Sequence, residues 1–96
     1  MIQITHKNNT ITIKGHSGYE EAGKDIVCGS VSNIAITSVN AIIRLEPESI
    51  DIEKEDGYLK IEILKNTKVT DTLIENMMDL FYQLEQQSQK YVKIKK

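Results

Sequence analysis

Residues 26–45, "IVCGSVSNIAITSVNAIIRL", decide the fold, because no charged residue occurs between Asp25 and Arg44. A helix on a protein surface normally carries a charged face. Serine, asparagine and threonine interrupt this stretch too often for a membrane span, and its many β-branched residues lower its intrinsic helix propensity. We therefore expect a helix from about Ile26 to Leu45 that packing holds together. A sheet would cover its apolar face, and a second helix or a partner subunit its small polar face.

Alternating apolar and polar residues predict two β-hairpins around this helix. In the first fifteen residues, isoleucines alternate with polar residues on both sides of a turn at Lys7-Asn8-Asn9. A second alternating run, from Ile50 to Ile63, contains Asp56-Gly57, two residues that tolerate the positive φ of a tight turn. Residues 92–94 predict one last strand.

A second, amphipathic helix is expected to start near Thr70 to Thr72, where Thr72 and Glu75 have the spacing of a capping box. Its predicted buried face consists of Leu73, Met77, Leu80, Phe81 and Leu84. The element order is then β-β-α-β-β-α-β. This order predicts a single α+β domain over residues 1–96, a two-layer sandwich with two helices packed on one face of a mixed sheet.

Composition narrows the function. The 96 residues include 12 basic and 14 acidic side chains, a balance that does not indicate a nucleic-acid or membrane surface. A single cysteine cannot form an internal disulfide, and the N-terminus lacks a signal-peptide pattern, so we expect a cytoplasmic protein. Cys28, His6 and His16 are the only cysteine and histidines, which argues against a structural metal site. We treat His6 as a surface residue.

Cys28 and His16 are the candidate chemical pair. We expect Cys28 in the first turn of the helix, with Asp25 as its cap, where unpaired N–H groups would favour a thiolate. His16, on the preceding loop, could take the thiol proton and return it to a leaving amine. The N–H groups of Cys28 or Gly29 could bind the oxyanion of acyl transfer. Alternatively, a lone cysteine in a helix is a small buried hydrophobe and a lone histidine a surface residue.

The loop before the helix contains Gly15, Gly18 and Gly23. Three glycines suit a segment that moves to admit a substrate, and they also suit plain turn geometry.

The stretch "GHSGYEEAGKDIVCGSVS", residues 15–32, resembles the signature of the ribosomal-processing cysteine protease family (Prp, YsxB-like). The resemblance implies a cysteine endopeptidase that removes the N-terminal extension of a bacterial large-subunit ribosomal protein and cleaves after an aromatic residue. It also implies a homodimer, with no metal and no cofactor.

Carried over position by position, the resemblance makes His16 and Cys28 the catalytic residues. Asp25 is a helix cap or a third catalytic group. Ser32 bonds to the preceding turn or stabilises substrate or thiolate, and Gly29 supports the oxyanion. Tyr19 walls a peptide groove or packs the loop. The predicted substrate-gating loop comprises Gly15, Ser17, Gly18, Tyr19 and Gly23.

The expected partner is therefore an extended peptide with apolar contacts near the loop, without direct nucleic-acid or membrane binding. Four C-terminal lysines form either a solvated strand face or a ribosome-facing patch: Lys90, Lys93, Lys95 and Lys96. Two other functions fit the same residues. One is a non-enzymatic ribosome-associated module, and the other is a thiol redox or thiol-transfer protein that uses Cys28.

Overall fold

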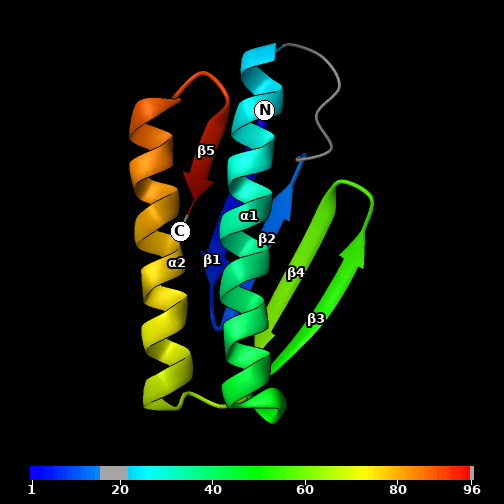
Figure 1. The fold of residues 1–96 in the computed structure, drawn as a ribbon, viewed down its shortest axis with the longest axis vertical. Coiled ribbons are helices and arrows are strands. Elements are labelled where there is room, and N and C mark those ends of the chain that lie inside the picture. Colours follow the sequence, from blue (N-terminus) through cyan, green and yellow to red (C-terminus); the bar gives the residue numbers. More distant parts are fainter. Residues whose placement is uncertain (16–21, 96) are drawn as a thin grey trace.

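The structure is a computed structural model that describes residues 1–15 and 22–95, except for the side chains of residues 22–25. The elements are β1 (Ile2–Lys7), β2 (Thr10–Lys14), α1 (Ala22–Leu45), a 3-10 turn η1 (Pro47–Ser49), β3 (Ile50–Glu55), β4 (Tyr58–Ile63), α2 (Lys68–Gln87) and β5 (Val92–Lys95). The five strands form one sheet in the order β3-β4-β2-β1-β5, in which only the β1–β5 pair is parallel. Both helices lie side by side on one face of the sheet (Figure 1). The predicted α+β sandwich with a mixed sheet is confirmed.

Both predicted hairpins form, and their turn residues explain why. Asn8 and Asn9 have φ of 52° and 63°, a left-handed conformation that asparagine tolerates better than most residues. Gly57 has φ of 71° in the β3–β4 turn. The β1–β2 register places Ile4 opposite Ile13, so the isoleucines of the two strands share the face that the helices cover.

Helix α1 starts four residues earlier than predicted, at Ala22. Asp25 therefore lies inside the helix rather than at its cap, and Gly23 belongs to the first helical turn rather than to a loop. Ala22 and Lys24 are good helix formers, and they extend the helix past the aspartate that the prediction used as its boundary.

Helix α2 also starts earlier than predicted. Thr67 is its N-cap, and the Thr67 Oγ1 accepts a hydrogen bond of 3.1 Å from the backbone N–H of Thr70. The predicted capping box at Thr72 and Glu75 is wrong, because both residues lie within the helix. Leu80, expected in the core, is 37% exposed. The face that is actually buried consists of Thr70, Ile74, Met77, Met78 and Phe81.

Helix α1 packs on the sheet with one side and against α2 with a flank. Residues Ile26–Leu45 are long and apolar enough to cross a membrane, with a mean hydropathy of 1.7, yet here they form the central helix of the sandwich. The expectation that both sides are covered holds only in part. The outward side stays open in the single chain, where Ile26 is 72% and Ile43 is 43% exposed.

The C-terminal end of α1 is tied to α2 by buried hydrogen bonds. The hydroxyl oxygens of Ser49 and Thr70 lie 2.7 Å apart, and both residues are fully buried. Ser49 Oγ also donates to the carbonyl of Glu46 (2.8 Å), and the Ser49 carbonyl accepts from the N–H of Leu64 (2.7 Å). A buried polar group costs stability unless it is paired, so this network fixes how η1, β4 and α2 meet.

Candidate active site

Cys28 faces the end of strand β2. Its sulfur donates a long hydrogen bond of 4.0 Å to the carbonyl oxygen of Gly15, and the residue is only 4% exposed. Cys28 comes six residues after Ala22, so it lies in the second turn of α1 and not in the first. The electrostatic effect of a helix end falls off within one turn. Cys28 lies one turn further from the helix start than the sequence predicted.

Gly15 is fixed by its surroundings rather than chosen for mobility. Its φ is +86°, and a Cβ at this position would lie 2.7 Å from the carbonyl oxygen of Met1. Its N–H donates to the carbonyl oxygen of Gly57 at 2.8 Å. Of the two explanations for this glycine, turn geometry is the one that the structure supports. The result is a rigid carbonyl placed beside the Cys28 thiol.

Ser32 and Gly29 surround Cys28 on the same helix. Ser32 lies one turn further along α1, half-buried, on the face that carries Cys28. Gly29 is exposed, and a Cβ there would meet nothing within 4 Å. The N–H groups of Cys28 and Gly29 lie beyond the four free N–H groups of a helix start, so they bond to carbonyls one turn back. The oxyanion role of Gly29 stays a prediction.

Four of the predicted site residues lie outside the described residues: His16, Ser17, Gly18 and Tyr19. The side chain of Asp25 is also outside the description. The Cys28–His16 pair, the catalytic role of Asp25 and the gating loop therefore remain predictions.

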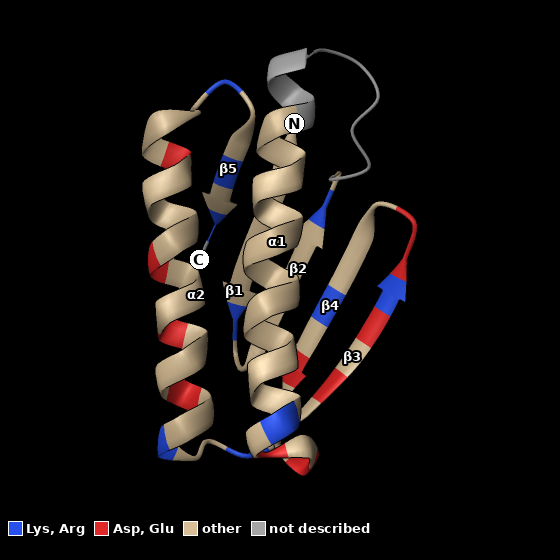
Figure 2. Ribbon diagram, viewed as in Figure 1, with Lys and Arg blue, Asp and Glu red and all other residues tan. Residues whose placement is uncertain are grey.

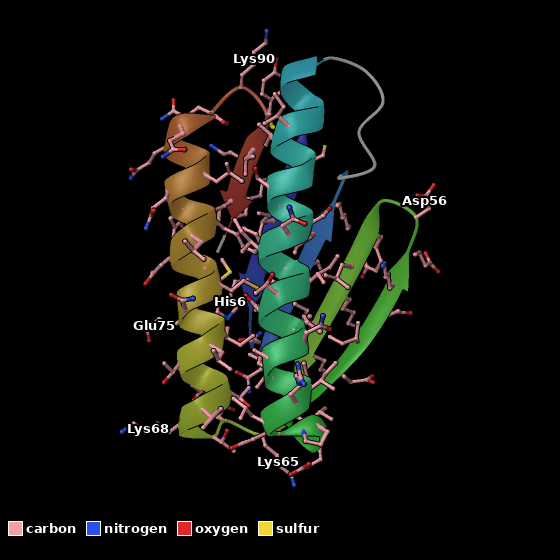
Figure 3. The ribbon with its side chains drawn as sticks, in the orientation of Figure 1. His6, Asp56, Lys65, Lys68, Glu75 and Lys90 are labelled. Carbon is pink, nitrogen blue, oxygen red and sulfur yellow. The ribbon has the colours of Figure 1, made fainter. Side chains whose placement is uncertain are left out.

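His6 does not belong to this site. It pairs with Ile11 in the β1–β2 ladder, four residues from Gly15 and hence about 13 Å away along the strand. Figure 3 shows His6 in the lower half of the view, whereas the N-terminal end of α1 is at the top. His6 instead lines a hollow beside α2 that also contains Glu75. His16 is therefore the only other histidine that could serve Cys28.

An apolar groove of about 280 Å³ opens between α1 and the sheet. Its α1 wall begins at Val31 and Ser32, three and four residues after Cys28, so the groove starts about one turn from Cys28 along the helix. Nothing in the sequence pattern predicted this groove. The residues that line it are Ile13, Val31, Ser32, Ala35, Ile36, Val39, Asn40, Ile52, Lys54 and Leu59.

Among the described residues, no group of three or more histidine, cysteine, aspartate or glutamate side chains is placed to hold a metal ion.

Comparison with known proteins gives consistent matches. The family model "Cysteine protease Prp" matches residues 1–93. A "Ribosomal processing cysteine protease Prp" of Staphylococcus aureus is 29% identical over 91 residues, covering 92% of this chain and 86% of the relative. The protein of the same name from Bacillus subtilis is 34% identical over 71 residues, 65% of this chain and 62% of the relative.

Solved structures agree. The S. aureus ribosomal processing protease in complex with a substrate peptide superposes with a TM-score of 0.86 at 26% identity, covering 98% of this chain and 95% of that one. The same protease with a covalently linked product peptide gives a TM-score of 0.81 at 27% identity, covering 97% and 94%. The crystal structure of SMU.848 from Streptococcus mutans gives a TM-score of 0.82 at 30% identity, covering 99% of this chain and 92% of that one.

Fold, cysteine and relatives together define the class: this chain is a cysteine protease, an enzyme that hydrolyses peptide bonds. It belongs to the Prp family of ribosomal processing cysteine proteases. The alternatives of a non-enzymatic module and a thiol-transfer protein find no support among these relatives.

Proposed function

We propose that this protease acts in the cytoplasm and removes the N-terminal extension of a large-subunit ribosomal protein, cleaving after an aromatic residue. The observation that carries the proposal is the position of Cys28. Its sulfur lies 4.0 Å from the carbonyl of Gly15, the residue that precedes His16 in the chain, and its helix face continues into an apolar groove. The nucleophile thus lies beside the residue that precedes the candidate base in the chain, and about one helical turn from a groove suited to apolar side chains.

In the proposed reaction His16 takes the proton of the Cys28 thiol, and the sulfur attacks the scissile carbonyl carbon. A C–S bond forms, and the tetrahedral intermediate collapses with loss of the amine, which receives the proton from His16. Water then hydrolyses the thioester, releasing the new carboxylate and restoring the thiol. Asp25 and Ser32 are proposed to support this pair, Asp25 by orienting the histidine and Ser32 from the next turn.

The test uses a synthetic peptide that spans the extension and the first mature residues of the ribosomal protein from the same organism. We expect the unmodified enzyme to cut it after the aromatic residue. Cys28→Ala should abolish cleavage and His16→Ala should lower kcat by about 10³-fold or more. Ser38→Ala is the matched control, because Ser38 is a buried α1 residue whose hydroxyl donates to the Ile34 carbonyl (2.8 Å). Normal cleavage by a folded Cys28→Ala protein would refute the proposal.

We also propose that a second copy of the chain covers the open side of α1, giving a homodimer. Exposed isoleucines on an uncharged helix face support this, since such a face is unusual on a monomer surface. Ile43→Glu should convert a dimer to a monomer in sedimentation velocity, whereas Val69→Glu on α2 should not. A monomeric unmodified protein would contradict the dimer.

A contact with the ribosome is proposed through the exposed Lys90, Lys93 and Lys95 at the β5 end of the sheet. Co-sedimentation with ribosomes should weaken in the Lys93→Glu/Lys95→Glu protein. Equal co-sedimentation of the two proteins would exclude this patch.

A further inference from the structure

The two edges of the sheet differ in whether their backbone is free. At the β5 edge, the outward N–H of Val92 donates to the Ser88 carbonyl (3.1 Å), and that of Ile94 donates to the Glu85 carboxylate (2.8 Å). This edge is closed by its own chain, which prevents another strand from pairing there.

Strand β3 forms the opposite edge. The two-residue turn makes Glu55 and Tyr58 a hydrogen-bonded pair, and alternate β3 residues then bond to β4, as the bond from Leu64 N–H to the Ser49 carbonyl (2.7 Å) confirms. The backbone groups of Ile52 and Lys54 consequently point away from the sheet. Within the described part of the chain, no hydrogen bond occupies them. A further strand could pair with β3.

The side chains of β3 have different chemistry on its two faces. Ile52 and Lys54 lie on the helix side and line the apolar groove, whose α1 wall continues the face of Cys28. In a strand added beside β3, the side chains opposite Ile52 and Lys54 would lie on the helix side of the sheet. They would point toward the same groove. The groove is therefore continuous with the open edge.

The other face of β3 is acidic. Asp51, Glu53 and Glu55 alternate along it, and residues 46–62 hold seven acidic and two basic side chains. Figure 2 shows these acidic residues along β3, and Figure 3 shows Asp56 at the tip of the hairpin. Antiparallel pairing of β3 with a second copy would set carboxylates opposite carboxylates, which is destabilising. A peptide with lysine or arginine on this face would instead pair with them.

We infer that β3 binds the substrate as an added strand: an extended peptide with alternating apolar and basic side chains, the apolar ones entering the groove. The inference rests on the proposed peptidase function, because the groove leads to Cys28. The hairpin tip is itself bonded to the site through the hydrogen bond from Gly15 N–H to the Gly57 carbonyl (2.8 Å). The hairpin tip therefore lies at the same end of the sheet as the Gly15 carbonyl that contacts Cys28.

The test measures binding separately from cleavage. The Cys28→Ala protein is titrated with a labelled peptide of alternating valine and lysine, and with the same peptide carrying glutamate for lysine. We expect the lysine peptide to bind about ten-fold more tightly. Glu53→Lys should weaken its binding about five-fold. Glu62→Lys is the matched control, with the same charge change on the same face of β4, one strand further from the edge.

Amide exchange locates the peptide. Addition of the lysine peptide should slow exchange at Ile52 and Lys54, and leave Val92 and Ile94 unchanged because those amides are already bonded. Equal effects of Glu53→Lys and Glu62→Lys, or no protection at Ile52 and Lys54, would overturn the inference. A shift of the monomer–dimer equilibrium in Glu53→Lys without a change in peptide binding would also overturn it, and would assign the edge to a second copy. Cleavage of the junction peptide is scored independently, so the inference can fail while the proposed function stands.

Discussion

The two ends of helix α1 are held in different ways. Just beyond the C-terminal end, Ser49 and Thr70 are fully buried and their hydroxyl oxygens lie 2.7 Å apart, and Ser49 bonds further to Glu46 and Leu64. At the other end, the contact of Cys28 with Gly15 is a weak S–H···O interaction at 4.0 Å. The hydrogen bonds at the C-terminal end fix the packing of the sandwich, whereas the Cys28 thiol near the other end has only a weak contact. Substitutions at the two ends should therefore have different consequences.

The largest effect should come from Gly15→Ala, because Gly15 itself is tightly constrained although its contact with Cys28 is weak. The new Cβ would lie 2.7 Å from the Met1 carbonyl oxygen, and the alanine would have to adopt a φ of +86°. We therefore expect a loss of about 3 kcal/mol in unfolding free energy. Because the Gly15 carbonyl lies beside Cys28, kcat should also fall in the protein that remains folded. Urea unfolding and peptide cleavage measure the two effects. Unchanged stability would show that Gly15 is not constrained as described.

A smaller effect is expected at the C-terminal end from Thr70→Val. The change leaves Ser49 with a lost partner in a buried site, which should cost about 1–2 kcal/mol, with kcat unchanged. The double variant with Ser49→Ala should lose less than the sum of the two single losses. Strict additivity would mean that the two hydroxyls do not interact. A drop in kcat would contradict the claim that substitutions at this end affect stability and not catalysis.

The smallest effect should come from Gly29→Ala, and it should be favourable. Gly29 lies inside α1, and a Cβ there meets open space. Glycine is less favourable than alanine in a helix interior, so the melting temperature should rise by an amount equivalent to about 0.5–1 kcal/mol. A lower melting temperature would show that position 29 is not the open, helical site that the structure describes.

Periodicity predicted most of the fold, and the resemblance of residues 15–32 to a family signature predicted the enzyme class. The isoleucine alternation of β1 and β2 has one consistent solution, since a shift by one residue would expose the whole apolar face. Helix starts were less predictable, because Thr67 and Thr72 are both acceptable caps and the choice depends on where Thr70 finds a buried partner. The buried face of α2 was predicted with Leu80 in the core, whereas Ile74 and Met78 are buried and Leu80 is exposed, because the face depends on where α1 packs.

For the site, the sequence predicted Cys28 through its spacing from His16 and its motif. It could not show that Gly15 is locked between Met1 and Gly57, because these three residues meet only through the sheet. The groove beside α1 was unpredictable for the same reason, since its walls come from both a helix and two hairpins.

The central claim is that Cys28 attacks the peptide carbonyl. Its most direct test is the mass of the intact protein after rapid quenching in acid during turnover of the junction peptide as a reactive ester. The account predicts a covalent adduct equal to the acyl fragment that ends in the aromatic residue, and fragmentation should place it on Cys28 as a thioester. Turnover with the acyl group on any other residue, or an adduct of the same size on the Cys28→Ala protein, would contradict it.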